Sequence, residues 1–240
     1  MHDNSQRMFE RYAKSYFAPG MRVLEIGTTL DTSTYRRAVR DSSVTWETLE
    51  LVKLAGVTHV PTDKYHYPLP DDHYDVVVSG NVAEHVPRIW DWMTELRRIV
   101  KPGGLIITIA PVSWPYHDAP GDCWRLYPEA MRALCDFTDL RLERCEWGSL
   151  EAASYWRVWP GRGRIAASTS SRRRYAVFRV LSWVGYAVEV AYDMVAVARK
   201  PERDTPAVAA APLSRTATSS SNTEMPRGTE SGSPLSPTSG

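Results

Sequence analysis

The chain has 240 residues, a net charge of +1 at pH 7, 43% hydrophobic residues and 24% charged residues. This length suits one domain, or one domain and a tail, and the near-neutral charge excludes a general electrostatic attraction to nucleic acid. The three cysteines lack CxxC spacing, which favours reduced thiols in a cytoplasmic protein over a disulfide framework or a zinc site. We therefore expect a cytoplasmic location, no nucleic-acid partner and no metal ion.

The N-terminal segment is polar and lacks the apolar core of a signal peptide. Its large apolar residues are spaced to lie on one side of a helix. These residues are Met8, Phe9, Tyr12, Tyr16 and Phe17. Two alternatives stay open for this helix: it closes over a bound ligand, or it merely covers the core.

Strand-like and helix-like segments alternate from residue 21 onward. MRVLEIG (21–27) predicts a buried strand, and a helix is expected over 34–40. VTWETLEL (44–51) predicts a second strand, residues 58–60 a weak third, and YDVVVSG (74–80) a fourth. This repeated alternation is typical of a parallel sheet with right-handed crossovers.

The next helix is expected over 89–100, where apolar residues recur at helical spacing. The sequence Lys-Pro-Gly-Gly (101–104) ends it, because proline cannot continue a helix and glycine accepts a left-handed turn. LIITIA (105–110) follows as a buried strand. A helix, an alternating strand and a final strand come last, at 128–135, 140–147 and 192–200.

Two segments stand apart from this pattern. Residues 148–192 form an insert that contains an apolar stretch (175–188). Ionisable residues occur within this stretch and next to it. Each such residue costs roughly 2.5–3.5 kcal/mol at a bilayer centre, so we expect a helix packed on the domain and no transmembrane segment. Peripheral membrane contact through residues 165–190 is the alternative. Residues 201–240 are rich in Pro, Ser and Thr and predict a disordered tail, which leaves the domain at residues 1–200.

In a doubly wound sheet the ligand lies at the carboxyl ends of the strands. Glu50 ends the second strand and lies 23 residues after Gly27. An acid that accepts ribose hydroxyls is expected ~20 residues after the first strand's glycine turn. Other polar residues at strand ends are Glu25, Asp31, Asp63, Asn81, Glu84 and His85, with the segment 111–125 after the fifth strand.

Four blocks occur in a characteristic order: VLEIG, an acid after the next strand, PLPDDHYDVVVSGNVAEHV and LRRIVKPGGLIITIA. Over residues 20–111 this order and spacing resemble the class I S-adenosylmethionine-dependent methyltransferases, in particular the group called type 11. The resemblance implies a doubly wound, mostly parallel seven-stranded α/β sheet, Rossmann-like, with helices on both faces and the last strand antiparallel. It also implies S-adenosyl-L-methionine as cofactor.

The resemblance assigns individual residues to this cofactor. Gly27 matches the glycine that lets the backbone approach the methionine part, and Glu25 matches the acid that helps to hold the amino group. Glu50 matches the ribose acid, and Asp63 matches the residue near the adenine amino group. The chain passes the methionine part and the substrate at Asn81 and Val82.

One departure from the family concerns the loop after Gly27. The family has a second and often a third glycine there, where this chain has Thr29 and Asp31. A threonine does not readily adopt a positive φ. Three explanations stay open: a wider loop, a polar contact from Asp31 to the cofactor, or a degenerate cofactor site.

Methyl transfer from a sulfonium is an in-line displacement, so the protein mainly aligns the acceptor and excludes water. A base is needed only where the acceptor loses a proton. The candidates for catalysis are His85, His117 and Asp118. The candidates for orienting or covering the acceptor lie in the segment after the fifth strand, and they are Trp114, Tyr116, Asp122, Trp124 and Arg125.

Competing enzyme classes lack their motifs. A dinucleotide dehydrogenase needs G-x-G-x-x-G, of which only Gly27 is present. Amino-methyltransferases of nucleic acids carry Asn-Pro-Pro-aromatic where this chain has Ser-Gly-Asn-Val (79–82). We therefore predict methylation of a small-molecule or sugar-like (glycan) acceptor at oxygen, with nitrogen and carbon still open. The rival hypothesis is an inactive methyltransferase-like fold that acts as a binding or regulatory partner, and the oligomeric state is left open.

Overall fold

A computed structural model describes residues 3–114, 116–117, 121–150, 155–159, 162–167 and 192–202. Contacts between Cα atoms divide the chain into a compact unit, Met1–Thr205, and a second unit, Pro206–Gly240. The second unit lies outside the described residues, as does the apolar stretch of the insert. The predicted tail and the packing of the insert therefore stay predictions.

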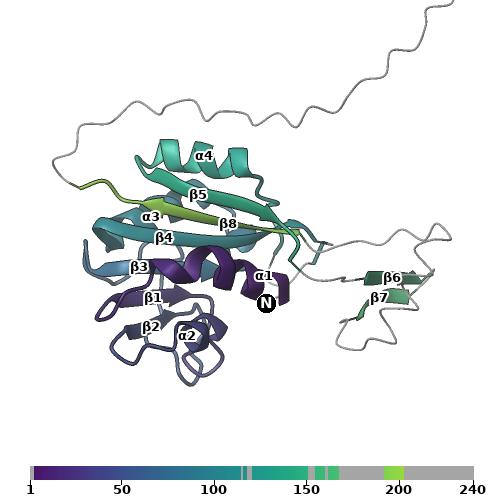
Figure 1. Ribbon diagram of the computed structural model, residues 1–240, viewed down its shortest axis with the longest axis horizontal. Coiled ribbons are helices and arrows are strands. Elements are labelled where there is room, and N and C mark those ends of the chain that lie inside the picture. Colours follow the sequence, from purple (N-terminus) through teal and green to yellow (C-terminus); the bar gives the residue numbers. More distant parts are fainter. Residues whose placement is uncertain are drawn as a thin grey trace, which may run out of the picture. The chain divides into compact units, whose positions relative to one another are not determined.

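The first unit contains a six-stranded sheet in the order β2-β1-β3-β4-β8-β5 (Figure 1). β1 pairs in parallel with β2 and β3, and β3 pairs in parallel with β4, whereas β8 is antiparallel to both of its neighbours. The α/β class and the antiparallel last strand are confirmed. The strands are β1 (Arg22–Ile26), β2 (Thr45–Leu49), β3 (Tyr74–Gly80), β4 (Val100–Ser113), β5 (Arg141–Gly148) and β8 (Tyr192–Arg199).

The seventh strand of the prediction is not confirmed within the described residues. The segment expected as a weak third strand, residues 58–60, makes a single parallel bridge between His59 and Leu49. His59 N–H donates to Thr48 O, and Glu50 N–H donates to His59 O. The ladder cannot continue through Pro61, because proline has no N–H to donate. The expected third strand is therefore reduced to a single β-bridge with β2.

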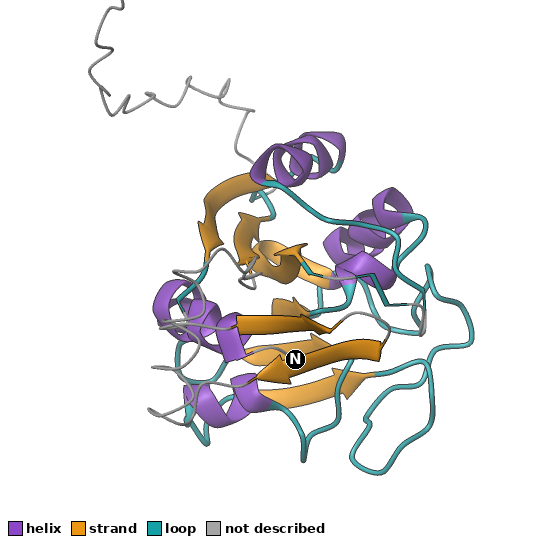
Figure 2. Cartoon of the chain, turned by 90° about the vertical axis from the view of Figure 1, so that its right-hand side faces the viewer, coloured by secondary structure: helices purple, strands orange, loops and turns teal. Residues whose placement is uncertain are grey.

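Helices cover both faces of the sheet (Figures 1 and 2). On one face lie the N-terminal helical segment and α2, and on the other lie α3 and α4. The N-terminal segment begins as an α-helix and continues as a π-helical turn and a 3-10 turn. The bounds are α1 (Asp3–Met8), η1 (Phe9–Ala13), η2 (Lys14–Tyr16), α2 (Thr34–Val39), η3 (Ala83–His85), α3 (Ile89–Ile99) and α4 (Pro128–Phe137).

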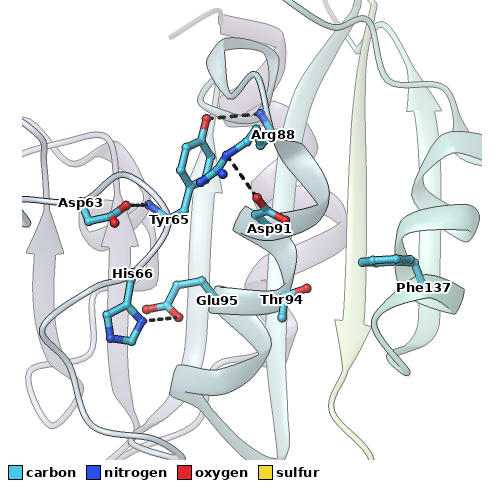
Figure 3. A pocket seen from close by; sticks show the side chains of 8 residues that line it. All are labelled: Asp63, Tyr65, His66, Arg88, Asp91, Thr94, Glu95 and Phe137. Atoms are coloured by element: carbon cyan, nitrogen blue, oxygen red, sulfur yellow. Dashed lines mark hydrogen bonds and ion pairs between the residues drawn. The ribbon is translucent and has the colours of Figure 1, made fainter.

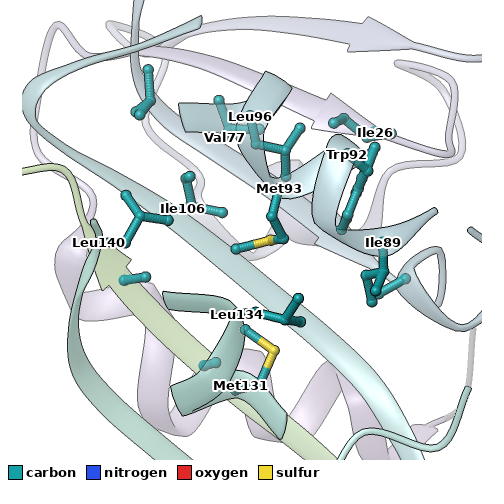
Figure 4. Close-up of a cluster of buried hydrophobic side chains, with 14 of the residues drawn as sticks. Ile26, Val77, Ile89, Trp92, Met93, Leu96, Ile106, Met131, Leu134 and Leu140 are labelled. Carbon is teal, nitrogen blue, oxygen red and sulfur yellow. The ribbon is translucent and has the colours of Figure 1, made fainter. Parts of the chain in front are cut away.

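The core is split by the sheet into two clusters, because successive side chains of a strand point to opposite faces. In β3, Val76 and Val78 join the cluster beneath the N-terminal helix, whereas Val77 joins the cluster beneath α3 and α4. Trp92 and Met93 of α3 fill the second cluster (Figure 4). Helices thus pack on both faces of the sheet and leave the carboxyl ends of its parallel strands for a site.

The insert between β5 and β8 contains a hairpin of β6 (Tyr155–Trp159) and β7 (Arg162–Ala167), which pair antiparallel. No described helix is long and apolar enough to cross a membrane.

Candidate functional site

Glu25, the acid expected to hold an amino group, is buried in β1. Its Oε2 accepts hydrogen bonds from the Ser33 hydroxyl and, at 2.8 Å, from the Trp46 indole N–H. Burial raises the pKa of Glu25 to about 7, although both hydrogen bonds lower it. Its Oε1 has no hydrogen-bond partner in the described part of the chain. Glu25 thus links the loop after β1 to β2 and leaves one oxygen for a further donor.

The loop after β1 needs only one left-handed residue. Gly27 has φ +86°, and a Cβ there would overlap a methyl group of Val82. Thr29 and Asp31 do not have positive φ, and the Thr29 and Thr32 hydroxyls lie 2.8 Å apart. The missing second and third glycines therefore cause no backbone strain. Asp31 is exposed on this loop, and its contact with a cofactor stays a prediction.

A buried polar network joins α1 to the ends of the strands. The Asn4 side chain donates at 2.9 Å to both Gly148 O and Asp193 Oδ2. The Ser5 hydroxyl lies 3.1 Å from Asn81 Oδ1 and 3.1 Å from Asp193 Oδ2. Asn81 follows β3 in the left-handed conformation, with φ 56°. The N-terminal helix therefore covers the sheet and also reaches the residue expected beside the methionine part of a cofactor.

The buried polar atoms at these strand ends that have no hydrogen-bond partner within the described residues include Glu25 Oε1, Tyr35 OH, Ser79 Oγ and Asn81 Nδ2. Tyr35 is fully buried, and its hydroxyl lies against Gly80, where a Cβ would overlap it. Burial, and then the nearby Glu25 carboxylate, raises the pKa of Tyr35 well above its usual value. An unsatisfied buried polar atom costs about 1–3 kcal/mol, so these atoms indicate a place where a ligand or water completes the bonding.

The two acids expected beside ribose and adenine lie on loops after the strands. Glu50 is half-buried directly after β2, and its Oε1 accepts the Leu51 N–H at 2.7 Å. Asp63 is exposed, and its Oδ1 accepts the Tyr65 N–H at 2.7 Å. Asp63 also lines a shallow hollow beside α3, where the Arg88 guanidinium lies 3.9 Å from the centre of the Tyr65 ring (Figure 3). Of the predicted cofactor residues, only Asp63 lines this hollow.

The predicted acceptor residues come together after β3 and β4. His85 ends η3, and its Nε2 lies 3.3 Å from Nε2 of His117. His117 Nδ1 lies 3.2 Å from Asp122 Oδ2, and the Asp122 side chain is 1% exposed. The Arg125 guanidinium binds both Asp122 oxygens and lowers the pKa of Asp122 to about 2. Asp118 lies outside the described residues, so its expected part in catalysis stays a prediction.

The predicted aromatic residues have different surroundings. Trp124 donates its indole N–H to Val86 O at 2.8 Å and meets Trp90 edge-on. The Trp114 carbonyl accepts two hydrogen bonds from Arg125, at 3.0 and 2.9 Å. Tyr116 is 69% exposed. Trp114 and Trp124 are thus anchored to Arg125 and to the residue after His85, and stacking of any of the three aromatic residues on an acceptor stays a prediction.

Several residues of the site were not expected from the sequence. Asn4, Ser5, Tyr35 and Asp193 are all buried at the same end of the sheet as Asn81. Polar residues within an N-terminal helix or at the start of a last strand carry no distinguishing spacing. Their only signal is that Asn4 and Ser5 precede the apolar Met8 and Phe9 on one amphipathic helix.

The family described as "Methyltransferase domain" matches residues 14–108. An "Uncharacterized methyltransferase" of Mycobacterium bovis is 58% identical over 40 residues, which are 17% of this chain and 16% of that protein. The matched segment therefore spans about a sixth of the relative's length.

Solved structures of low sequence identity share the fold. A SAM-dependent methyltransferase from Archaeoglobus fulgidus superposes with a TM-score of 0.51 at 16% identity, covering 81% of this chain and 92% of that one. Phosphoethanolamine N-methyltransferase 2 of Haemonchus contortus, in complex with S-adenosyl-L-methionine, gives a TM-score of 0.51 at 14% identity, covering 82% and 52%.

Proposed function

We propose that this chain, which belongs through residues 14–108 to the class I S-adenosylmethionine-dependent methyltransferases, transfers a methyl group to a hydroxyl of a small-molecule or sugar-like acceptor. The observation that carries the proposal is the group of buried polar atoms without partners in the described residues, Glu25 Oε1, Tyr35 OH and Asn81 Nδ2. They gather at the strand ends, where a doubly wound sheet binds its ligand. A cofactor with amino, carboxylate and hydroxyl groups would satisfy such atoms.

The residues present fit S-adenosylmethionine. When bound, this cofactor supplies a methyl group that is already activated on a sulfonium. Glu50 is proposed to accept the ribose hydroxyls, and Asp63 to lie near the adenine amino group. Gly27, in the left-handed conformation, would let the backbone approach the methionine part, and Asn81 would offer its side-chain amide there.

The acceptor is proposed to bind near His85 and His117. His85 ends η3, which follows Asn81 and Val82 directly in the chain, so it would lie close to the methionine part of the cofactor. A hydroxyl must lose its proton as it attacks, and these imidazoles are the proposed proton acceptors on that side. Trp114 and Trp124 would exclude water. Oxygen as the target atom rests on this histidine pair, since a neutral amine acceptor needs no base before it attacks.

Calorimetric titration of S-adenosylhomocysteine into the full chain tests the cofactor proposal. We expect saturable micromolar binding, and a fall in affinity of about tenfold or more in Glu50→Ala, because hydrogen bonds to a carboxylate are worth about 1.5–3 kcal/mol. Glu129→Ala, which removes an exposed acid from the first turn of α4, serves as the matched control and should bind like the wild type. A wild-type chain that binds no ligand would favour the inactive binding partner instead.

A further inference from the structure

The Ser5 hydroxyl of α1 joins two groups that lie far apart in the sequence. Its Oγ is 3.1 Å from the side-chain amide of Asn81 and 3.1 Å from Asp193 Oδ2. Ser5 and Asp193 are fully buried, so water does not compete for the contact between them. Ser5 therefore links the loop after β3 to the start of β8.

A hydroxyl has one hydrogen to donate, and this decides the direction of the chain of hydrogen bonds. The carboxylate of Asp193 can only accept, and its Oδ2 also accepts an N–H of Asn4 at 2.9 Å. The Ser5 hydrogen therefore goes to Asp193, and Ser5 Oγ is left to accept from Asn81. Within the Asn81 side chain, only the amino group can donate.

The Asn81 amide accordingly presents its nitrogen to Ser5 and its oxygen to the opposite side. The oxygen and the nitrogen of an amide have almost the same shape, so the hydrogen bonds decide which of them faces Ser5. With the oxygen toward Ser5, one contact of 3.1 Å would join two acceptors, and the amino group would be buried without a partner in the described part of the chain. The opposite orientation makes both contacts of Ser5 hydrogen bonds and leaves a carbonyl oxygen to be satisfied.

This carbonyl oxygen belongs to the same place as Glu25 and Tyr35. The Tyr35 hydroxyl lies against Gly80, the residue before Asn81. Burial, and then the charges of Glu25 and Asp193, raise the pKa of Tyr35, so both carboxylates are near its hydroxyl. Glu25 Oε1 is a second acceptor without a partner among the described residues. Two acceptor oxygens beside carboxylate charge suit a positively charged donor, such as an ammonium group.

We propose that Ser5 and Asp193 position the Asn81 amide so that its carbonyl oxygen, together with Glu25 Oε1, accepts hydrogen bonds from the α-ammonium group of the cofactor. The ligand is the one that the proposed function supplies, so this role depends on that function. Ser5 and Asp193 are positioning residues, because they act through Asn81. Both lie outside the matched residues 14–108, so the segments that flank the family's domain set the orientation of a group within it.

The orientation of the amide is tested first, by nuclear magnetic resonance of the isotope-labelled full chain without a ligand. We expect strong nuclear Overhauser contacts between the Asn81 side-chain amide protons and the β-protons of Ser5. These amide protons should also exchange slowly with solvent, because the hydrogen bond to Ser5 is buried. Rapidly exchanging amide protons without contacts to Ser5 would overturn the orientation.

The role toward the ammonium group is tested by calorimetry with two ligands, S-adenosylhomocysteine and its analogue in which hydrogen replaces the α-amino group. The wild type should bind S-adenosylhomocysteine at least about tenfold more tightly than the analogue. Ser5→Ala should lower the affinity for S-adenosylhomocysteine about tenfold and leave the affinity for the analogue within about twofold.

Two further variants accompany Ser5→Ala. Ser5→Cys should have the same effect, because a thiol fills the space of the hydroxyl, so that water cannot replace it, but forms only weak hydrogen bonds. Arg7→Ala changes an exposed residue of the same helix and is the matched control. It should bind both ligands like the wild type.

The two ligands separate the outcomes. Unchanged binding of the analogue shows that the Ser5 variants are folded, so a selective loss of S-adenosylhomocysteine binding supports the positioning role. An equal loss for both ligands, or no loss for either, would overturn that role and leave the proposed function standing. A wild-type chain that binds neither ligand would overturn the proposed function, and the contacts between Ser5 and the Asn81 amide would still decide the orientation.

Discussion

At the scale of single residues, the burial of Glu25 makes stability depend on pH. Its pKa is about 7 in the folded chain, above the ordinary value of 4.5. The unfolded chain therefore releases this proton first, so the contribution of Glu25 is fully favourable below pH 4.5 and is lost as pH rises toward 7. Glu25→Gln removes this loss, so we expect the wild type to lose roughly 3 kcal/mol relative to the variant across this range.

Urea unfolding of the wild type and Glu25→Gln at several pH values between 4 and 8 measures this difference. The comparison cancels the titration of every other group, because both chains share them. A free-energy difference that does not change with pH would show that the pKa of Glu25 is the same in the folded and the unfolded chain.

Gly27 is constrained by both its backbone and its neighbour. Gly27→Ala forces a Cβ into the left-handed region and against Val82, and we expect a loss of roughly 2–4 kcal/mol in the free energy of unfolding. Gly20→Ala is the matched control, because Gly20 has φ +78° but no atom within 4 Å of an added Cβ. It should lose only about 1 kcal/mol. Val82→Ala combined with Gly27→Ala should recover the difference, and equal losses in the two single variants would contradict the overlap.

At the scale of elements, α1 connects the ends of two strands through side-chain hydrogen bonds, in addition to packing on the sheet. Asn4 donates to Gly148 O at the end of β5 and to Asp193 of β8, and its own oxygen accepts the Leu150 N–H at 2.7 Å. Asn4→Ala removes these three hydrogen bonds, so we expect a loss of about 3 kcal/mol and faster hydrogen exchange at Leu150. Arg7→Ala changes an exposed residue of the same helix and should leave both quantities unchanged.

At the scale of the whole molecule, the compact unit ends at Thr205. The composition of the following residues predicts that they contribute no core. A chain of residues 1–205 should therefore keep the melting temperature and the S-adenosylhomocysteine affinity of the full chain. Differential scanning calorimetry and titration measure both. A lower melting temperature would instead indicate that the last residues pack on the domain.

The elements themselves were predictable, because short-range patterns decide them. YDVVVSG became β3 at the expected bounds, and the helix expected over 89–100 ends one residue earlier, at Ile99. The third strand was overestimated, since its three residues are followed by Pro61 and form one bridge. The altered loop after Gly27 also could not be judged from residue types, because only the backbone shows that Thr29 avoids positive φ.

The family resemblance implied the antiparallel last strand. The sequence by itself determined the α/β class, the order of the elements and the strand ends where a ligand would lie. It could do so because hydrophobic period, glycine and proline act within a few residues of chain. Only the tertiary structure decided that His85 meets His117 across 32 residues, and that Asn4 meets Asp193 across 189. Contacts of that separation depend on how the sheet is wound and on which helix covers which face, and no local pattern records them.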